Sequence, residues 1–350
     1  MNNINKFVSA TVGLGTGYFI WAAGRHEKID FNGRSVVITG GSRGLGLVLA
    51  RQLAREGAHL SLIAQDEAEL ERAGANLSNL GAQVLLIACD LREREQAENA
   101  IRQVLSHYGK IDVLINNAGT IQVGPLEHIE LEDFEDAMAT HFWAALYTMQ
   151  TAVPAMRRRG GGRIVNISSI GGRIAVPHML PYSASKHALI GLSDGMRNEL
   201  AKDKIYVTTV SPGLLRTGSP PNAFFKGRQR EEYSWFAISD SSPLLAIDAG
   251  RAAHQIIEAC RVGKPELTIT WQARAAIIAN VLFPDLTATV LSLANQFLPK
   301  PTKDEQGDRL QTGWESQSNL APSALTSLSD RATMDNNGLK DNPASALKND

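Results

Sequence analysis

Cysteine is scarce in this chain, with only Cys89 and Cys260 among 350 residues. Both lie in apolar segments, and they show no metal-ligand spacing. A disulfide framework is therefore excluded, and we expect no metal centre. We interpret both cysteines as small core residues of a protein from a reducing compartment, which favours the cytoplasm.

An excess of charge of one sign is also missing. The sequence has 35 lysines and arginines against 36 aspartates and glutamates, so its formal net charge is −1. Nucleic-acid-binding proteins usually carry a strongly basic face, and we therefore expect no nucleic-acid partner. No internal repeat is visible, and the length suits one large domain or two smaller ones.

A comfortably long hydrophobic span is missing as well. Within the N-terminal segment 1–30, residues 7–23 form an uncharged run of 17 residues, the short limit for crossing a bilayer. The run lacks the cleavage site of a signal peptide. Two interpretations stay open: a membrane anchor or surface contact, and an apolar arm packed on the protein.

A strand, a glycine-rich turn and a helix follow one another near residue 40. Residues 35–39 form a short apolar strand pattern, and a helical pattern runs from 47 to 56. Glycines allow close backbone approach to a phosphate, and a helix start offers free N–H groups. The turn is therefore a candidate pyrophosphate site made of Thr39, Gly40, Ser42, Arg43, Gly44, Leu45 and Gly46.

Strand and helix patterns then alternate. The patterns predict strands at 59–64, 83–88 and 112–115 and helices at 66–80 and 93–107. This rhythm indicates an α/β fold, a Rossmann-like doubly wound parallel sheet with helices on both faces. Ligands of such sheets bind beyond the strand carboxyl ends, where we expect Gly40, Asp90 and Asn117 to gather.

The stretch from Ser169 to Lys186 carries the candidate chemistry. An apolar strand pattern at 163–168 ends at Ser169, and Tyr182 and Lys186 stand four apart in a helical pattern running to about 201. Such residues share a helix face, and a nearby cation lowers the pKa of a phenol. Tyr182 is a candidate proton donor or acceptor for a carbonyl/alcohol pair, with Ser169 bonded to the same oxygen. Alone, this spacing is weak evidence, because any helix can contain it by chance.

Taken together, these motifs resemble those of a classical short-chain dehydrogenase/reductase (SDR). The matching residues are the glycine loop 39–46, the motif Asn-Asn-Ala-Gly at 116–119, Ser169, Tyr182 and Lys186, and the loop 212–217. The resemblance covers about residues 31 to 270. It implies a single Rossmann domain at 31–272.

The resemblance implies roles for these residues. Tyr182 would be the general acid/base, Lys186 would bind the nicotinamide ribose and lower the tyrosine pKa, and Ser169 would hold the substrate oxygen. Other implied cofactor contacts are Gln65, Asp90, Leu91, Asn117, Ala118, Gly119, Pro212, Gly213 and Thr217. Relatives commonly pair through helices at about 131–158 and 182–201, which implies a homodimer or homotetramer.

The end of the second strand bears on the choice between NAD and NADP. NAD-preferring relatives usually carry an aspartate there, whereas this chain has Ala64 followed by Gln65. Arg43 can pair with a 2′-phosphate, although it can also be a solvated loop residue. Asp66 lies close to the end of this strand, and an acidic residue there favours NAD. We expect NADP, with NAD as the lesser candidate.

His141 departs from the family pattern. Relatives usually have an asparagine there, which holds a water of the proton relay; this chain reads Thr140-His141-Phe142. An imidazole can also hold a water and titrates near neutral pH, which would keep the relay. The alternative is a structural histidine bonded to a backbone carbonyl, with the relay altered. A third outcome is a weak or inactive enzyme.

Three later segments extend the pattern. The loop-rich stretch 214–245 contains aromatic residues that form either an apolar pocket wall or lid packing. In the apolar extension 273–299, Pro284 predicts two short helices, which could cap the pocket, contact another subunit or lie in a membrane interface. We favour membrane contact, because an apolar N-terminal run is present too.

The last segment, residues 300–350, is polar and shows no periodicity. This composition predicts a disordered tail.

The sequence therefore predicts an NADP-dependent carbonyl reductase or alcohol dehydrogenase in contact with a membrane. We expect an apolar substrate, such as a lipid-derived or another bulky ketone. An alternative is a catalytically weak, regulatory or scaffolding protein that binds NADP, which the His141 departure supports. Epimerase or dehydratase chemistry on a nucleotide-linked sugar is a third hypothesis. It fits poorly, because the sugar lobe would have to come from the polar tail.

Overall fold

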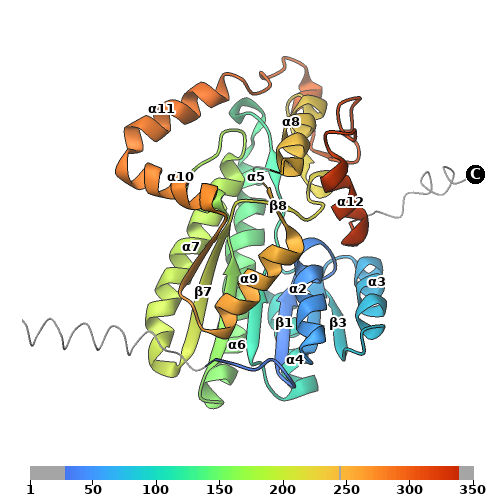
Figure 1. Cartoon of the computed structure of the whole chain (residues 1–350), viewed down its shortest axis with the longest axis vertical. Helices are drawn as coiled ribbons and strands as arrows, with labels where there is room; N and C mark the ends of the chain where they lie inside the picture. Colours follow the sequence, from blue (N-terminus) through green and yellow to red (C-terminus); the bar gives the residue numbers. More distant parts are fainter. Residues whose placement is uncertain (1–27, 244–245, 339–350) are drawn as a thin grey trace, which may run out of the picture.

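The computed structural model describes residues 28–243 and 246–338, and a seven-stranded sheet lies at its centre (Figure 1). All neighbouring strands are parallel, in the order β11-β7-β6-β4-β1-β2-β3. The order reverses between β1 and β4, and ligands of such sheets bind beyond the strand carboxyl ends at that point. The strands are β1 Ser35–Thr39, β2 His59–Ala64, β3 Val84–Ala88, β4 Val113–Asn116, β6 Gly162–Ile167, β7 Ile205–Pro212 and β11 Glu266–Ile269.

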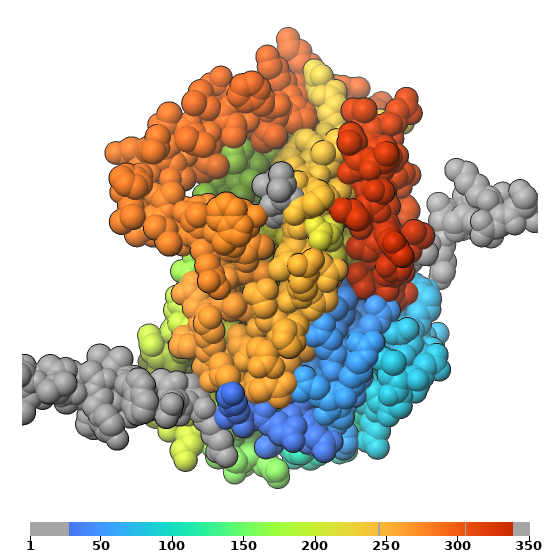
Figure 2. Space-filling model, in the orientation of Figure 1, coloured from blue at the N-terminus to red at the C-terminus, as the bar shows by residue number. Residues whose placement is uncertain are grey.

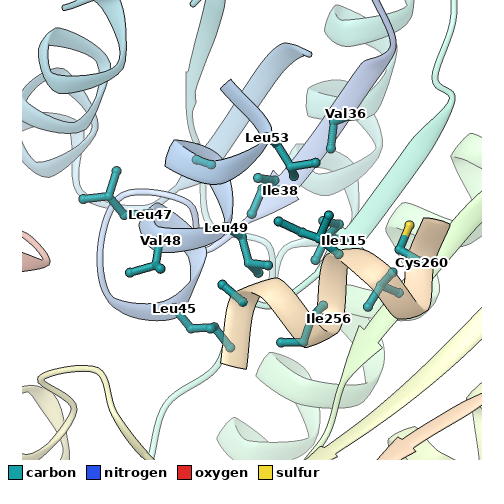
Figure 3. Packing of buried hydrophobic residues seen from close by; sticks show 14 of the residues in the cluster. Val36, Ile38, Leu45, Leu47, Val48, Leu49, Leu53, Ile115, Ile256 and Cys260 are labelled. Carbon is teal, nitrogen blue, oxygen red and sulfur yellow. The ribbon is translucent and has the colours of Figure 1, made fainter. Parts of the chain in front are cut away.

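Helices cover both faces of the sheet, as a doubly wound fold requires. Figure 3 shows one layer, in which Leu45 and Leu49 of α2 lie beside Ile256 of α9. Cys260 is buried in this layer, as predicted for a core residue, whereas Cys89 is half-buried. One face carries α2 Gly44–Arg55, α3 Glu67–Ser78 and α9 Ala249–Arg261, and the other carries α4 Arg94–Tyr108, α6 Ala144–Arg158 and α7 Leu180–Leu200.

The long helix predicted at 131–158 contains a local break. It consists of α5 (Leu131–Met138) and α6, joined by a turn of π-helix at Ala139–Trp143. A π turn inserts one residue into the helical repeat and is frequent at functional sites. His141 is the middle residue of this turn, so the break sets the direction of its side chain.

A smaller lobe lies beyond the carboxyl ends of the large sheet (Figure 1). Its aromatic side chains Phe225, Tyr233 and Phe236 are buried against one another, with ring centroids 5.5 and 6.0 Å apart. These aromatics of the loop-rich stretch therefore pack the lobe itself. The lobe contains β5 Gln122–Val123, β9 Phe224–Phe225, β12 Gln311–Thr312, α8 Gln229–Ser241 and the parallel pair β8 Leu214–Arg216 and β10 Ala246–Asp248.

Two helices, α10 (Trp271–Leu282) and α11 (Pro284–Asn295), project from the body of the protein (Figures 1 and 2). We call residues 271–295 the apolar arm. The predicted split at Pro284 is confirmed, because Pro284 is the first residue of α11. In the described part of the chain, no helix combines the length and the apolarity needed to cross a bilayer. The N-terminal run 7–23 lies outside the described residues.

The expectation of a disordered tail is wrong for residues 300–338. This stretch forms β12 and the helix α12 (Ser327–Asp335), and it packs against α8 and β9. The physical reason is hydrogen bonding to buried partners: Ser329 Oγ donates to Asp240 (2.7 Å), and Ser241 Oγ donates to the Thr326 carbonyl (3.1 Å). Composition alone does not reveal such partners. Residues 339–350 lie outside the described part.

Candidate active site

The glycine loop between β1 and α2 contains two glycines that no other residue can replace. Gly40 has a φ of +61°, and a Cβ on it would lie 2.8 Å from the Cα of Ala118. A Cβ on Gly46 would lie 2.0 Å from the carbonyl oxygen of Gly40. These close approaches form a compact cradle at the start of α2, which fits the pyrophosphate of a dinucleotide.

Hydrogen bonds tie this loop to the end of β4. Thr39 Oγ1 accepts from the backbone N–H groups of Asn117 (2.9 Å) and Ala118 (3.0 Å). The Asn117 side-chain amide donates to the carbonyl oxygens of Thr39 (3.1 Å) and Gly40 (3.0 Å). Four residues predicted to bind the cofactor therefore meet at the strand ends. Asn117 fixes the distance between two strands as well as lining the site.

Ser42 and Arg43 share a carboxylate that the sequence did not indicate. Glu69 of α3 is buried, and its two oxygens accept from Ser42 Oγ (3.0 Å) and Arg43 Nη1 (2.9 Å). Arg43 Nη1 also donates to Asn222 Oδ1 (2.8 Å). Arg43 is thus a bonded residue of the loop and not a free solvated one.

Asp90 lies at the next strand end, where a contact with the adenine ring is expected. Its Oδ2 accepts from Gln65 Nε2 (3.2 Å) and from Arg92 Nη2 (2.7 Å). The hydrogen bond from Arg92 holds the pKa of Asp90 below its usual value, against the opposing effect of burial. Leu91 is buried directly beside it. Gln65 and Asp90, both implied cofactor contacts, therefore touch each other at neighbouring strand ends.

Ser169, Tyr182 and Lys186 converge at the end of β6. A Cβ on Gly171 would lie 3.1 Å from Tyr182 Cε1 and 3.5 Å from Ser169 Oγ, so both side chains border the same point. The Ser169 hydroxyl is hydrogen-bonded to Tyr182. Lys186 Nζ lies 5.7 Å from the centroid of the Tyr182 ring and donates to the Ile167 carbonyl (2.9 Å). The arrangement brings an acid/base group and a hydrogen-bond donor to one position.

Burial controls the proton affinities of this group. It raises the pKa of Tyr182, which the bond from Ser169 opposes, and it lowers the pKa of Lys186 to about 7. The expected depression of the tyrosine pKa is therefore absent from this arrangement. Spacing predicts that the two residues are neighbours, but the desolvation of the phenolate is the largest influence on the tyrosine pKa.

His141 is a bonded, buried residue that borders Tyr182. Its Nδ1 lies 2.7 Å from Ser185 Oγ, and its Nε2 lies 3.1 Å from the Thr120 carbonyl oxygen. The ring packs edge-on against the Tyr182 ring at a centroid distance of 5.4 Å. Burial, followed by the charge of Lys186, holds its pKa well below the usual value. The geometry favours the interpretation as a structural histidine, because protein atoms bond both ring nitrogens.

The loop after β7 forms the far wall of the site. Pro212 is the last residue of β7, and Gly213 stands where a Cβ would lie 3.1 Å from Thr270 Oγ1. Thr217 is buried beside the glycine loop: a Cβ built on Gly44 would lie 3.9 Å from the Thr217 Cβ. Gly119 lies on the opposite side, where a Cβ built on it would be 3.5 Å from Lys186 Nζ. The predicted site residues on these loops therefore lie close together at the carboxyl end of the sheet.

A family model described as short chain dehydrogenase matches residues 34–224. The chain belongs to the short-chain dehydrogenase family. This conclusion agrees with the sheet order and with the convergence of the serine, tyrosine and lysine. The match includes the glycine loop and all three of those side chains.

Individual relatives of this short-chain dehydrogenase differ in how much of the chain they cover. "Dehydrogenase/reductase SDR family protein 7-like" of Anopheles gambiae is 36% identical over 197 residues, which is 55% of this chain and 62% of that protein. The fatty acyl-CoA reductase of Acinetobacter baylyi is 30% identical over 276 residues, covering 78% and 88%. The structure of L-sorbose reductase from Gluconobacter frateurii with NADPH and L-sorbose has a TM-score of 0.62 and 27% identity, covering 69% and 97%. The chain thus spans less than two thirds of the Anopheles protein.

Several residues of the site were not indicated by the sequence. Glu69 lies three residues after Asp66, which caps α3 by accepting from the Glu69 N–H (2.8 Å). A cap signal at Asp66 could have placed Glu69 in the first helical turn, next to the glycine loop. No sequence signal pointed to Asn336 and Asn337, which reach the loop from the polar C-terminal stretch.

Proposed function

We propose that this protein is an NADP-dependent oxidoreductase that transfers hydride between the nicotinamide and a ketone or secondary alcohol. The observation that carries the proposal is the convergence of Ser169, Tyr182 and Lys186 beside a glycine loop that fits a dinucleotide. Two of the relatives are reductases by name, which supports the reaction class.

The side chains of the site bind the substrate oxygen and transfer a proton to it, and the nicotinamide would supply the hydride when bound. Ser169 is placed to donate a hydrogen bond to the substrate oxygen. The Tyr182 hydroxyl gives its proton to that oxygen as the carbonyl carbon is reduced, which yields the secondary alcohol. Lys186, with a pKa of about 7, is partly protonated near neutral pH, and its charge stabilises the tyrosinate that remains.

The preference for NADP rests on Arg43 and on the second strand. β2 ends at Ala64, and Gln65 follows, so neither position carries the acid that repels a 2′-phosphate. The hydrogen bonds of Arg43 to Glu69 and Asn222 both use Nη1, and the Arg43 side chain is 36% exposed, so the guanidinium keeps further donors for a phosphate. Glu69 is the opposing feature, because its carboxylate lies within the same cluster. Arg43→Ala is expected to weaken NADPH binding more than NADH binding; the reverse ranking would favour NAD.

An apolar substrate and membrane contact are proposed from the apolar arm. The side chains of Trp271, Val281, Leu282, Phe283 and Leu286 are 58 to 74% exposed. α11 has no buried residue, and its side chains Leu286, Val290 and Leu293 are 51 to 61% exposed. A large apolar surface of this kind marks an interaction site, and a lipid interface accepts the apolar face of a helix that lies along it.

Co-flotation with phosphatidylcholine vesicles tests the membrane contact. Phe283→Asp should keep the protein in the soluble fraction, because a charge at the turn of the arm opposes insertion. Leu320→Asp, at a side chain 60% exposed in the C-terminal stretch, is the matched control and should float with the parent protein. Equal flotation of both variants, or none by the parent, rejects the contact.

The oxidoreductase itself is tested by following NADPH oxidation with ketones and aldehydes of rising size. Turnover should increase with apolar bulk and should vanish in Tyr182→Phe, which keeps the ring and removes the acid. If NADPH binds and no carbonyl in the series is reduced, the alternative of an NADP-binding regulatory protein is favoured. Full activity in Tyr182→Phe would reject the assigned proton donor.

A further inference from the structure

The C-terminal segment 327–338 crosses the glycine loop of the cofactor site. Figure 2 shows this segment, in red, directly against the blue residues of α2. The backbone N–H of Gly44, the first residue of α2, donates to the Asn336 carbonyl oxygen (3.0 Å). N–H groups at a helix start are the donors that a dinucleotide phosphate uses. A protein carbonyl therefore takes one of the groups that the cofactor needs.

Asn337 closes the gap between the glycine loop and α3. Its side-chain amide donates to the carbonyl oxygens of Ser42 (2.8 Å) and Glu69 (3.0 Å), and its Oδ1 accepts from Arg72 Nε (3.0 Å). In a doubly wound fold, the adenosine ribose binds between the first strand–helix turn and the end of the second strand. Asn337 bridges the two walls of that position.

The rest of the segment is attached by polar contacts as well. Arg51 Nη1 donates to the Asp335 carbonyl oxygen (2.9 Å), and the Asn222 amide donates to the Gly338 carbonyl oxygen (3.1 Å). Asn222 is also the residue that accepts from Arg43, so the segment is linked to the proposed phosphate ligand through a single side chain. The C-terminal segment is therefore attached through residues that also belong to, or bond to, the cofactor site.

This attachment is built to be reversible. The buried side chains of α12 are the small residues Ser329 and Thr333, whereas Leu328 and Met334 are 45% and 60% exposed. An element held by exchangeable hydrogen bonds and little apolar burial opens at a low free-energy cost. Water can replace each of these bonds, and a phosphate oxygen can replace the Asn336 carbonyl as the acceptor from the Gly44 N–H.

We propose that the C-terminal segment is an autoinhibitory gate, which occupies the adenosine end of the cofactor site and is released when the dinucleotide binds. The inference rests on the proposed function, because it requires that the glycine loop binds NADP(H). The apparent dissociation constant of the cofactor then equals the intrinsic value divided by the fraction of open molecules. Weakening the segment raises that fraction and tightens cofactor binding.

Asn337→Gly is the variant that tests the gate in the full chain. Asn337 has a φ of +57°, which glycine adopts freely, so the change removes three side-chain hydrogen bonds and leaves the backbone path intact. NADPH titration followed by its fluorescence should give a dissociation constant about tenfold lower than that of the parent. Met334→Ala, on an exposed side chain of the same segment, is the control and should match the parent.

A chain ending at Met334 removes Asn336 and Asn337 and keeps most of α12, and it should bind NADPH at least as tightly as Asn337→Gly. Weaker binding by either variant would show that the segment completes the site, and equal binding would show that it is not coupled; both results overturn the gate and leave the proposed function standing. If NADPH binds to neither parent nor variants, the proposed function fails together with the gate.

Hydrogen exchange gives an independent measurement on the parent protein. Saturation with NADPH should speed the exchange of the backbone amides of residues 330–338, because the released segment loses its contacts. Slower exchange there would mean that the segment closes over the cofactor, which contradicts the gate.

Discussion

A buried carboxyl group beneath the C-terminal helix makes the stability of the protein depend on pH. Asp240 of α8 is 3% exposed and accepts a hydrogen bond from Ser329 of α12 (2.7 Å). Burial raises its pKa from 3.8 to about 7, against the opposing effects of the bond from Ser329 and the charge of Arg216. Because the folded pKa lies above the unfolded value, the neutral carboxyl stabilises the fold at low pH. That contribution is lost as the pH rises from about 4 through 7.

The size of this effect follows from the shift. The difference between about 7 and 3.8 is about three units, and each unit corresponds to 1.36 kcal/mol, which gives an upper value of about 4 kcal/mol. Asp240→Asn keeps the shape of the side chain and its acceptor for Ser329, but it does not titrate. We therefore expect the variant to gain stability relative to the parent protein as the pH rises from 5 to 8.

Urea unfolding of both proteins at pH 5, 6, 7 and 8 measures this difference. Other titrating groups, such as His141, contribute equally to parent and variant, so they cancel in the comparison. Asp285→Asn, at an exposed position of the arm, is the control and should follow the parent at every pH. A difference between Asp240→Asn and the parent that varies by less than about 1 kcal/mol across this range would refute the reasoning.

Three further changes test other parts of the structure. His141→Asn should retain or improve turnover while lowering the free energy of unfolding by about 2 kcal/mol, because the ring loses its bonds; a collapse of kcat would show that the imidazole has its own role. Gly46→Ala should cost about 3 kcal/mol or more in thermal unfolding, because its Cβ would lie 2.0 Å from the Gly40 carbonyl oxygen, and an unchanged Tm would contradict this. Lys226→Met should lower the free energy of unfolding in urea by about 3 kcal/mol, because the buried carboxylate of Asp133, which lies 2.8 Å from Lys226 Nζ, loses its cation. An unchanged free energy of unfolding would show that this ion pair does not stabilise the fold.

The central sheet could be predicted well from the sequence. The limits of β1 at 35–39 and β2 at 59–64 agree with the prediction to the residue. Buried parallel strands are short apolar runs between polar turns, so their limits are visible in the sequence. The alternation of strands and helices then predicted that Gly40, Asp90 and Asn117 lie at one edge of the sheet.

Other features could not be predicted, because they depend on contacts distant in sequence. The π turn around His141 changes a helical repeat by one residue, which hydrophobic periodicity does not resolve over so short a stretch. The order of the C-terminal stretch arises from partners such as Asp240 and Gly44, which lie far away along the chain. The spacing of Tyr182 and Lys186 showed their proximity, whereas their pKa values follow from burial that only the folded structure defines.

The small sheet of the upper lobe has a consequence for how the protein is made. β9 pairs with β5, and it also pairs with β12 at Gln311–Thr312, which the ribosome produces much later. Chains generally fold from the N-terminus during synthesis, so the large sheet, complete at Ile269, can form first. Until β12 is made, the backbone edge of β9 stays unpaired beside the aromatic cluster of Phe225, Tyr233 and Phe236. During this interval the nascent chain is expected to need a chaperone, and messages truncated before residue 311 should yield aggregating protein.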